Sequence, residues 1–312
     1  MSRIVNILRA AHCRSTHHFF AIDALSRIET APGRRLGDLL LKHHREYLMG
    51  AKAPDKTFKD FQNHVLHVGD NNWGGAPQAC GKWAAKAIEH LNAKRWRKAA
   101  FACGVLSHYF TDPLMPLHTA QSPREAIVHR PFEWSVCQAY DEIYREWSSA
   151  GLHINFRLSS SPDWASQAVQ AAAAIAYPHY DRLLEIYDMK QAAVAPPLAL
   201  NGEARRILCE LFAVAITGWA QLLARLADET ETEIPNMKLG LATLLASIDI
   251  PLAWVVRRIS NASEQRAVAA VLHEYETTGD VVRHLPNEVK TVARERAATP
   301  TQSQPAPAVQ PT

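Results

Sequence analysis

The sequence predicts an all-α protein built as a multi-helix bundle. Apolar residues recur at helical spacing along Ala- and Leu-rich stretches, and the alternating Val, Ile and Thr runs of a sheet are almost missing. Pro-, Gly- and Asn-rich breaks, such as residues 69–75, separate these stretches. We therefore expect helices over 17–29, 35–50, 78–92, 95–112, 131–149, 163–188, 202–228, 237–258 and 262–278.

Local signals support the ends of several of these helices. Ser15 or Thr16 can cap the first helix. The helix 95–112 should end at Asp112-Pro113, because proline cannot continue a helix and restricts the residue before it. Pro131 is tolerated in the first turn of the helix 131–149. The helices after residue 160 rest on periodicity alone.

Length and composition describe a folded protein without a strong charge bias. Hydrophobic residues make up 47% of the 312 residues and charged residues 21%, which excludes wholesale disorder. The formal net charge of +3 is too small to indicate nucleic-acid binding by bulk charge. We expect a core over 1–160, a helical continuation or subdomain over 161–290, and a disordered Pro-, Gln- and Ala-rich tail over 291–312.

The cysteines and the amino terminus indicate a reducing, cytoplasmic location. The five cysteines are widely spaced and contain no Cys-x-x-Cys pair, and Arg9 and His12 interrupt the early apolar patch before a signal peptide could form. Residues 239–256 approach the length of a membrane span but contain Asp249 and Pro251. They are interpreted as a buried helix pair or as a surface that contacts a bilayer peripherally.

The densest chemical signal lies between residues 108 and 133. His108 and Asp112 are four residues apart and share one helix face, and His118 follows just beyond the helix end. His129 and Glu133 form a second pair with the same spacing. Imidazole and carboxylate ligands at these spacings suit Zn²⁺. The repetition of the pairs favours a metal site over isolated surface hydrogen bonds.

Further candidates lie upstream of these pairs. Asp55 follows Ala53-Pro54, and His64 and His67 precede the Gly- and Asn-rich loop. His17 and His18 stand at the start of the first predicted helix. Each of these would be unremarkable alone, but together with the later pairs they complete a ligand set.

In order and spacing, these motifs resemble the zinc-dependent phospholipase C family, including the related domain of glycosylphosphatidylinositol-specific phospholipase D. The resemblance covers about residues 12–150 and is carried by Thr16-His17, the run LLLKHHREYLMGAKAPD, His67-x2-Asp70, His108-x3-Asp112-x5-His118 and His129-x3-Glu133. It implies an all-α bundle with a metal cluster in a cleft between helices.

Carried over by position, the resemblance implies two zinc ions and leaves a third open. The first would be held by Asp55, His67, His108 and Asp112, and the second by His118, His129 and Glu133. Asp112 would bridge to a third metal bound by His17. In secreted relatives a terminal Trp completes that third site, whereas Ile4 falls at that position here. The third metal is therefore absent, weakly bound, or completed by His12, Cys13 or His18.

The expected activity is zinc-dependent hydrolysis of a phosphodiester through a metal-activated water, because such metals lower the pKa of bound water and neutralise phosphoryl charge. The expected substrate is a phospholipid or a related headgroup ester, with Asp55 as candidate general base. Asp70 and Asn63 are candidates for orienting the imidazoles.

Two alternatives remain open. One is a single-strand nuclease of the same fold, whose last ligand pair is usually His-x3-Asp rather than His129-x3-Glu133. It would need stacking aromatics, for which Trp73, Trp83 and Tyr109 are candidates, but no specific nucleic acid is expected. The other is a catalytically silent, zinc-stabilised binding module. The sequence does not indicate an oligomeric state.

Overall fold

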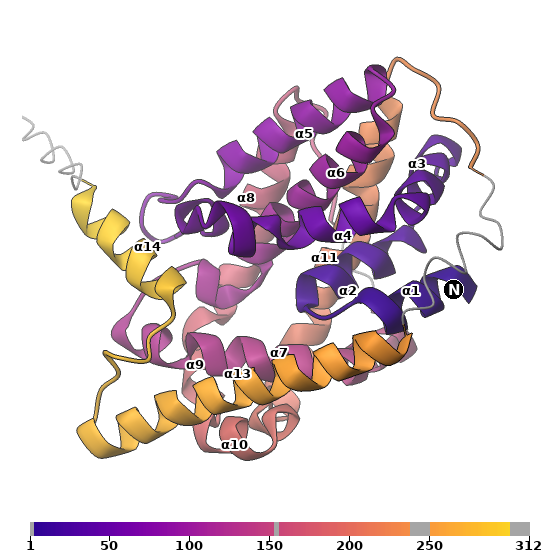
Figure 1. Cartoon of the computed structure of the whole chain (residues 1–312). Helices are drawn as coiled ribbons and strands as arrows, with labels where there is room; N and C mark the ends of the chain where they lie inside the picture. Colours follow the sequence, from indigo (N-terminus) through magenta and orange to yellow (C-terminus); the bar gives the residue numbers. More distant parts are fainter. Residues whose placement is uncertain (1–2, 153–155, 238–249, 300–312) are drawn as a thin grey trace, which may run out of the picture.

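The computed structural model shows a bundle of helices (Figure 1). It describes residues 3–152, 156–237 and 250–299, and the side chains of 250–257 are not described. Within these ranges there is no strand, only an isolated bridge between His67 and Trp73. The prediction of an all-α fold is confirmed.

The described helices fall into a long and a short class. The α-helices are α1 (Arg3–His12), α2 (Thr16–Leu25), α3 (Ala31–Lys42), α4 (His44–Ala53), α5 (Ala76–Asn92), α6 (Trp96–Thr111), α7 (Pro123–Ala150), α8 (Trp164–Ala176), α9 (Tyr180–Ile186), α10 (Met189–Val194), α11 (Gly202–Asp228), α13 (Ile250–Thr278) and α14 (Asn287–Ala298). The short 3₁₀ or π turns are η1 (Pro54–Phe58), η2 (Phe61–His64), η3 (Asp112–Leu114), η4 (Pro116–His118), η5 (Tyr177–His179) and η6 (Pro196–Ala199).

Helix α11 is the core of the bundle and packs against α2, α3 and α7. Its Trp219 is fully buried, and the indole N–H donates to the hydroxyl of Tyr47 at 2.7 Å. That hydroxyl in turn donates to the carbonyl oxygen of Ala21 at 2.8 Å, which links three helices. By length and composition α11 could cross a membrane, but 78% of its apolar window is buried inside the protein. It is therefore explained as a core helix.

Helices α4 and α6 approach each other closely at two glycines. A Cβ atom at Gly50 would overlap the carbonyl oxygen of Phe101, and one at Gly104 would overlap that of Tyr47. Only glycine lets the two backbones come this near. The contact matters for the site, because Asp55 lies just after α4 and His108 lies on α6.

Helix α7 begins eight residues earlier than the sequence predicts, at Pro123 instead of 131. The Ser122 hydroxyl caps it by accepting from the backbone N–H of Glu125 at 3.1 Å. Pro131 consequently lies inside the helix, where it removes one backbone donor. The earlier start places Glu125 one turn before His129 on the same helix face.

Other boundaries also differ from expectation. The helix predicted over 35–50 is divided at His43, and that over 163–188 is interrupted at Pro178. Helices α1 and α14 were not predicted, and the expected disordered tail over 291–312 is wrong as far as Ala298, which ends α14. Residues 300–312 lie outside the described residues, as do residues 239–249 of the stretch 239–256; the rest begins α13.

Candidate metal centre

Four side chains from separate elements meet at one point beside the α4–α6 contact. The Oδ2 atom of Asp112 lies 2.7 Å from Nδ1 of His64 and 3.0 Å from Nε2 of His108, and the two imidazole nitrogens are 3.2 Å apart. The Oδ1 atom of Asp55 lies 3.6 Å from the His64 nitrogen and 3.5 Å from the His108 nitrogen. Ligand atoms around a tetrahedral zinc with bonds of about 2.0–2.2 Å stand about 3.3–3.6 Å apart. The spacing therefore approaches that of a metal-binding cage.

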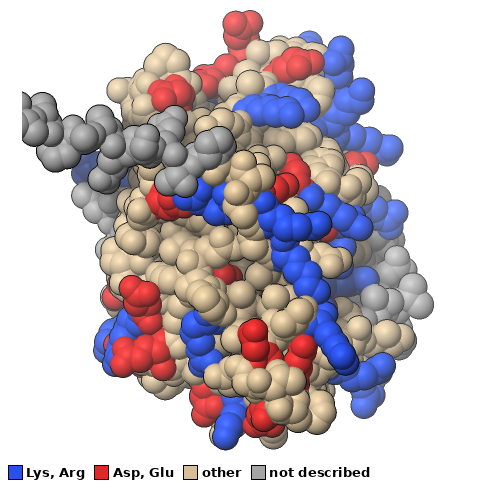
Figure 2. Space-filling view, turned by 90° about the vertical axis from the view of Figure 1, so that its left-hand side faces the viewer, with Lys and Arg blue, Asp and Glu red and all other residues tan. Residues whose placement is uncertain are grey.

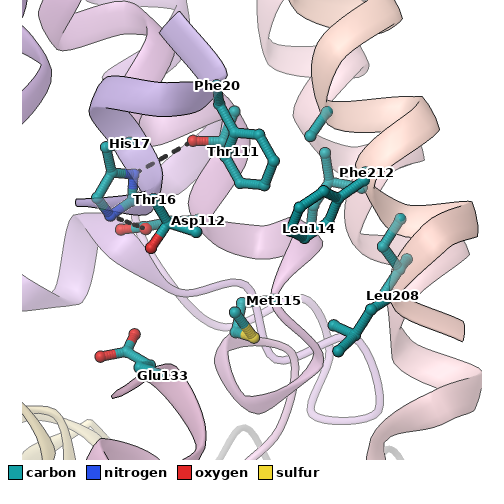
Figure 3. Close-up of a pocket in the computed structure, with 12 residues that line it drawn as sticks. Thr16, His17, Phe20, Thr111, Asp112, Leu114, Met115, Glu133, Leu208 and Phe212 are labelled. Carbon is teal, nitrogen blue, oxygen red and sulfur yellow. Dashed lines mark hydrogen bonds and ion pairs between the residues drawn. The ribbon is translucent and has the colours of Figure 1, made fainter. Parts of the chain in front are cut away.

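The second oxygen of Asp112 faces a different partner. Its Oδ1 atom lies 3.2 Å from Nε2 of His17, which projects from the start of α2 (Figure 3). One carboxylate thus has an oxygen toward each of two ligand groups. This is the geometry that a bridging carboxylate requires.

A further group is formed by His118, His129 and Glu133. The Oε1 atom of Glu133 lies 3.2 Å from Nε2 of His118 and 3.6 Å from Nε2 of His129. The structure thus brings together seven of the eight metal ligands predicted from the sequence, in three groups that could each hold an ion: His17, His108 and Asp112; Asp55, His64 and His108; His118, His129 and Glu133.

The outer ring nitrogens of the imidazoles are held by oxygen partners. Nδ1 of His108 lies 3.0 Å from the carbonyl oxygen of Ala51, and Nδ1 of His118 lies 3.2 Å from that of His64. Nδ1 of His17 lies 3.3 Å from the Thr111 hydroxyl, and Nδ1 of His129 lies 2.5 Å from Oε1 of Glu125. Such partners orient metal-ligating histidines. They leave the opposite nitrogen of each ring directed at the centre.

His67 is not placed where the sequence predicted. Among the described residues it belongs to none of the three groups, and His64 takes its place. The His67 backbone N–H donates to the carbonyl oxygen of Trp73 at 2.7 Å, and its ring lies 5.0 Å from that indole. Both histidines precede the same loop, so spacing could not separate them. The η2 turn carries His64 inward.

The two residues expected to orient the imidazoles have other partners. The Asn63 amide donates to Asp60 at 2.7 Å, and the Asp70 carboxylate pairs with Arg296. His18 is engaged at both ring nitrogens, 3.2 Å from the backbone nitrogen of Arg14 and 3.1 Å from the Leu48 carbonyl oxygen. It is therefore not directed at the His17 group.

Lys52 is a partly buried cation beside the centre that the sequence did not indicate. Its ammonium contacts Oδ2 of Asp55, whose other oxygen faces His64 and His108. Burial would lower the pKa of Lys52, but the Asp55 carboxylate raises it. Burial would raise the pKa of Asp55, but the charges of His108 and Lys52 hold it well below its usual range. The pair is therefore ionised at neutral pH.

The electrostatics of the third group reflect surplus negative charge. Burial disfavours charge on His118 and His129, yet Asp112 and Glu133 raise the pKa of His118 to about 9, and Glu133 with Glu125 raises that of His129 to about 10. The same imidazolium charges lower the pKa of Glu133 to about 2 against its own burial. In the absence of a metal, protons thus supply the positive charge that the carboxylates need.

These residues fit a zinc ion. Nε2 of His129 is buried and has no hydrogen-bond partner among the described residues, although it points at Glu133. A buried polar nitrogen without a hydrogen-bond partner or a metal lowers the stability of the folded protein. Nitrogen and oxygen donors without thiolate are a set that zinc accepts.

An apolar wall stands next to the His17 group. Leu208 and Phe212 from α11 line a small cavity of about 30 Å³ together with Phe20, Leu114 and Met115 (Figure 3). His17, Asp112 and Glu133 line the same cavity. Polar ligands and apolar side chains therefore share one space.

The fold and this cluster define an all-α protein with a largely buried set of nitrogen and oxygen donors suited to binding metal. Residues 16–178, just over half of the sequence, match the family described as zinc dependent phospholipase C, so the chain belongs to that family. The resemblance inferred from the motifs is thereby confirmed.

Solved structures show the same fold at low sequence identity. The alpha-toxin from Clostridium absonum is similar with a TM-score of 0.50 and 18% identity, over 70% of this chain and 64% of that one. The alpha-toxin from an avian strain of Clostridium perfringens is similar with a TM-score of 0.50 and 17% identity, over 69% and 64%. The chain spans just under two thirds of the length of these structures. No curated protein sequence matches it.

Proposed function

We propose that this protein is a zinc-dependent phosphodiester hydrolase that acts on phospholipids. Membership of the family supports the class of reaction. The observation that carries the proposal is the position of Asp112, whose two oxygens face separate groups of ligands. A carboxylate in this position can hold two metal ions at the short separation that phosphoryl chemistry uses.

The proposed ligands are the residues of the three groups: His17, Asp55, His64, His108, Asp112, His118, His129 and Glu133. Zinc bound there would lower the pKa of a bound water and neutralise charge on the phosphoryl oxygens. Two ions are proposed, with a third at His17 and Asp112. The groups that contact the outer ring nitrogens would hold the imidazoles in the orientation needed for metal binding. They belong to Ala51, Thr111, His64 and Glu125.

We retain Asp55 as the candidate general base. Its Oδ1 atom faces the ligand nitrogens of His64 and His108, and its Oδ2 atom contacts the Lys52 ammonium. Lys52 keeps Asp55 ionised, which is the form that binds zinc or accepts a proton, while the lowered pKa makes this carboxylate a weaker base than an ordinary one. Lys52 also holds the carboxylate in place, so it acts on the reaction by positioning Asp55.

The surroundings of the centre favour a lipid over a nucleic acid. The wall formed by Leu208 and Phe212 is suited to the apolar part of a phospholipid. The aromatics that a nuclease would use for stacking are engaged within the protein: Tyr109 is fully buried, Trp83 stacks on Phe58 at 5.7 Å, and Trp73 contacts Arg296.

The test combines metal content with substrate choice. Protein purified without chelators or a histidine tag is measured for zinc by elemental mass spectrometry. It is then assayed on phosphatidylcholine vesicles, single-stranded DNA and a generic phosphodiester. We expect at least two zinc per chain and release of a lipid product, whose identity as diacylglycerol or phosphatidic acid distinguishes the side of cleavage.

Two results would overturn this proposal. Cleavage of single-stranded DNA without cleavage of lipid would favour the nuclease. Full zinc content with no hydrolysis of any of the three substrates would favour the silent binding module.

A further inference from the structure

Helix α14 lies outside the segment that matches the family, yet it packs onto the metal centre. The match ends at residue 178, whereas α14 spans Asn287–Ala298. Its Val289 and Val292 are buried, and they share a cavity with His129 and with Leu117. In Figure 1 α14 stands at the left edge of the bundle, and Figure 2 views the molecule from that side. The helix therefore covers the ligand groups from outside.

Glu288, in the first turn of α14, places its carboxylate next to the metal centre. Its Oε1 atom lies 4.0 Å from Nδ1 of His64, and its side chain is only 18% exposed. It also lines the cavity beside His129 and interacts electrostatically with His118 and Glu133. A carboxylate held next to Glu133 meets like charge, so the rest of the helix must fix it there.

The other end of α14 is anchored to the loop between η2 and α5. The Arg296 guanidinium forms two hydrogen bonds with the Asp70 carboxylate, and its Nη2 donates to Oδ1 at 2.6 Å. It also lies 5.7 Å from the centre of the Trp73 ring. The Trp73 indole N–H donates to the hydroxyl of Thr299 at 3.1 Å, just beyond the helix. These contacts tie the end of α14 to the loop that directly follows the proposed ligand His64.

Where α14 lies against the ligand groups, little space is left beside them. A cavity that α14 lines together with His129 measures about 10 Å³, and a second cavity, lined by His17, Asp112 and Glu133 but not by α14, measures about 30 Å³. Sites that take small molecules usually measure about 300–1,000 Å³. A phospholipid headgroup therefore needs some element to move. Helix α14 covers His129 from outside the family-matched segment, and unlike α11 it is not part of the core of the bundle.

We propose that α14 is a built-in cover of the metal centre, and that the Glu288 carboxylate stands where the phosphate group of a substrate enters. The cover excludes anions until the Arg296 anchor is released. A carboxylate and a phosphate are both anionic oxygen donors, so they compete for the same positive centre. This inference rests on the proposed function for its substrate, but its test does not depend on turnover.

The test uses inorganic phosphate and the full chain loaded with zinc. Phosphate binding is measured by titration calorimetry for the wild type, Glu288→Gln and Arg296→Ala. Arg294→Ala is the matched control, because Arg294 is on the same helix and carries the same charge, and its hydrogen bonds among the described residues are to Lys290 and Thr291 of that helix. Arg294 lines a wide, open groove together with Lys59 and Phe61. We expect at least tenfold tighter phosphate binding in the first two variants and no change in the control.

Hydrogen exchange of residues 287–298 gives a second readout that needs neither zinc nor activity. We expect protection in the wild type and in Arg294→Ala, and faster exchange in Arg296→Ala. Equal phosphate affinity in all four proteins, or an unprotected α14 in the wild type, would overturn the cover. Tighter phosphate binding without any lipid hydrolysis would leave the cover in place and contradict the proposed function.

Discussion

Two buried clusters of charged side chains in this bundle differ in how their charges are balanced. At the junction of α1, α2 and α7, Asp23 faces Arg9 at 3.0 Å and accepts a hydrogen bond from the Tyr140 hydroxyl at 3.1 Å. The Arg9 guanidinium also lies over the Phe19 ring at 5.0 Å. Arg9 also pairs with the exposed Asp141 at 2.5 Å, so one permanent cation faces the buried Asp23 and a second carboxylate at the surface. This is the arrangement of a structural ion pair.

The metal centre is balanced differently: one permanent cation, Lys52, contacts Asp55, and the other positive charges that face its carboxylates come from imidazoles. Asp55, Asp112 and Glu133 face imidazoles, which carry a positive charge only when they bind protons. Their donor atoms converge on common points instead of meeting in pairs, and Nε2 of His129 is orphaned among the described residues. Both clusters contain buried carboxylates. What distinguishes the metal centre is that several donor atoms point at the same position, where their negative charge calls for a cation.

The largest expected effect comes from Asp112→Ala, because it removes an oxygen from both of the groups that Asp112 joins. We expect loss of more than one zinc per chain and a fall in phosphodiester hydrolysis of about 10³-fold, as several kcal/mol of transition-state stabilisation is lost. Elemental mass spectrometry and a steady-state assay measure the two effects. Loss of one zinc or none would exclude the bridging role.

The corresponding change in the structural pair should leave the metals alone. Arg9→Met isolates the buried Asp23 carboxylate, and we expect a loss of about 2–3 kcal/mol in the free energy of unfolding, less than for a fully buried pair because Arg9 is 20% exposed. Zinc content should not change. Denaturant unfolding of the variant is compared with that of Arg145→Met, an exposed arginine on α7. A loss of zinc in Arg9→Met would contradict the view that the Arg9–Asp23 cluster is purely structural and independent of the metal centre.

A smaller effect is expected at the partner of a single ligand. Glu125→Gln weakens the contact that orients His129, and the affinity of the His118–His129–Glu133 group for zinc should fall about 10–100-fold. Competition with a zinc chelator measures this affinity. Glu142→Gln, on the outer face of the same helix, serves as the control. Equal affinity in both variants would show that Glu125 does not orient the ligand.

The smallest effect concerns pH and again separates the two clusters. Burial, only partly offset by Arg9, raises the pKa of Asp23 from 3.8 to about 6 in the folded protein. The folded state therefore holds this proton more tightly than the unfolded state, so this group adds stability as pH falls from about 7 to about 4. The expected size is on the order of 1–2 kcal/mol. The free energy of unfolding is measured against pH for zinc-loaded wild type and Asp23→Asn. We expect the difference, wild type minus variant, to increase as pH falls. A difference independent of pH would contradict the prediction.

Helical spacing of apolar residues, together with breaks at Pro, Gly and Asn, predicted most of the helices. For example, α11 occupies its predicted range, 202–228. These signals failed where tertiary contacts set a boundary. Pro131 suggested a helix start, but α7 begins eight residues earlier at Pro123, where Ser122 caps it, and the packed helix accommodates the proline. Helix α14 has few apolar residues, and its fold depends on burying Val289 and Val292 against the centre.

The site was predictable where ligands share a helix and less so where a turn carries them. His108 with Asp112, and His129 with Glu133, follow from spacing along one helix. The choice between His64 and His67 depends on the η2 turn and the bridge to Trp73, which spacing does not encode. Lys52 and Glu288 reach the centre through packing of α4 and α14, so no motif marks them.

The contact between Gly50 and Gly104 bears on which ions this centre can hold. Because backbone meets backbone there, the gap between α4 and α6, and with it the width available between Asp55 and His108, is fixed at its lower limit. Zinc bonds of about 2.0–2.2 Å suit a narrow cage, whereas calcium, with bonds of about 2.3–2.6 Å and more ligands, would force the helices apart. We therefore expect discrimination by ionic radius to depend on Gly50 and Gly104, although neither residue belongs to the proposed ligands.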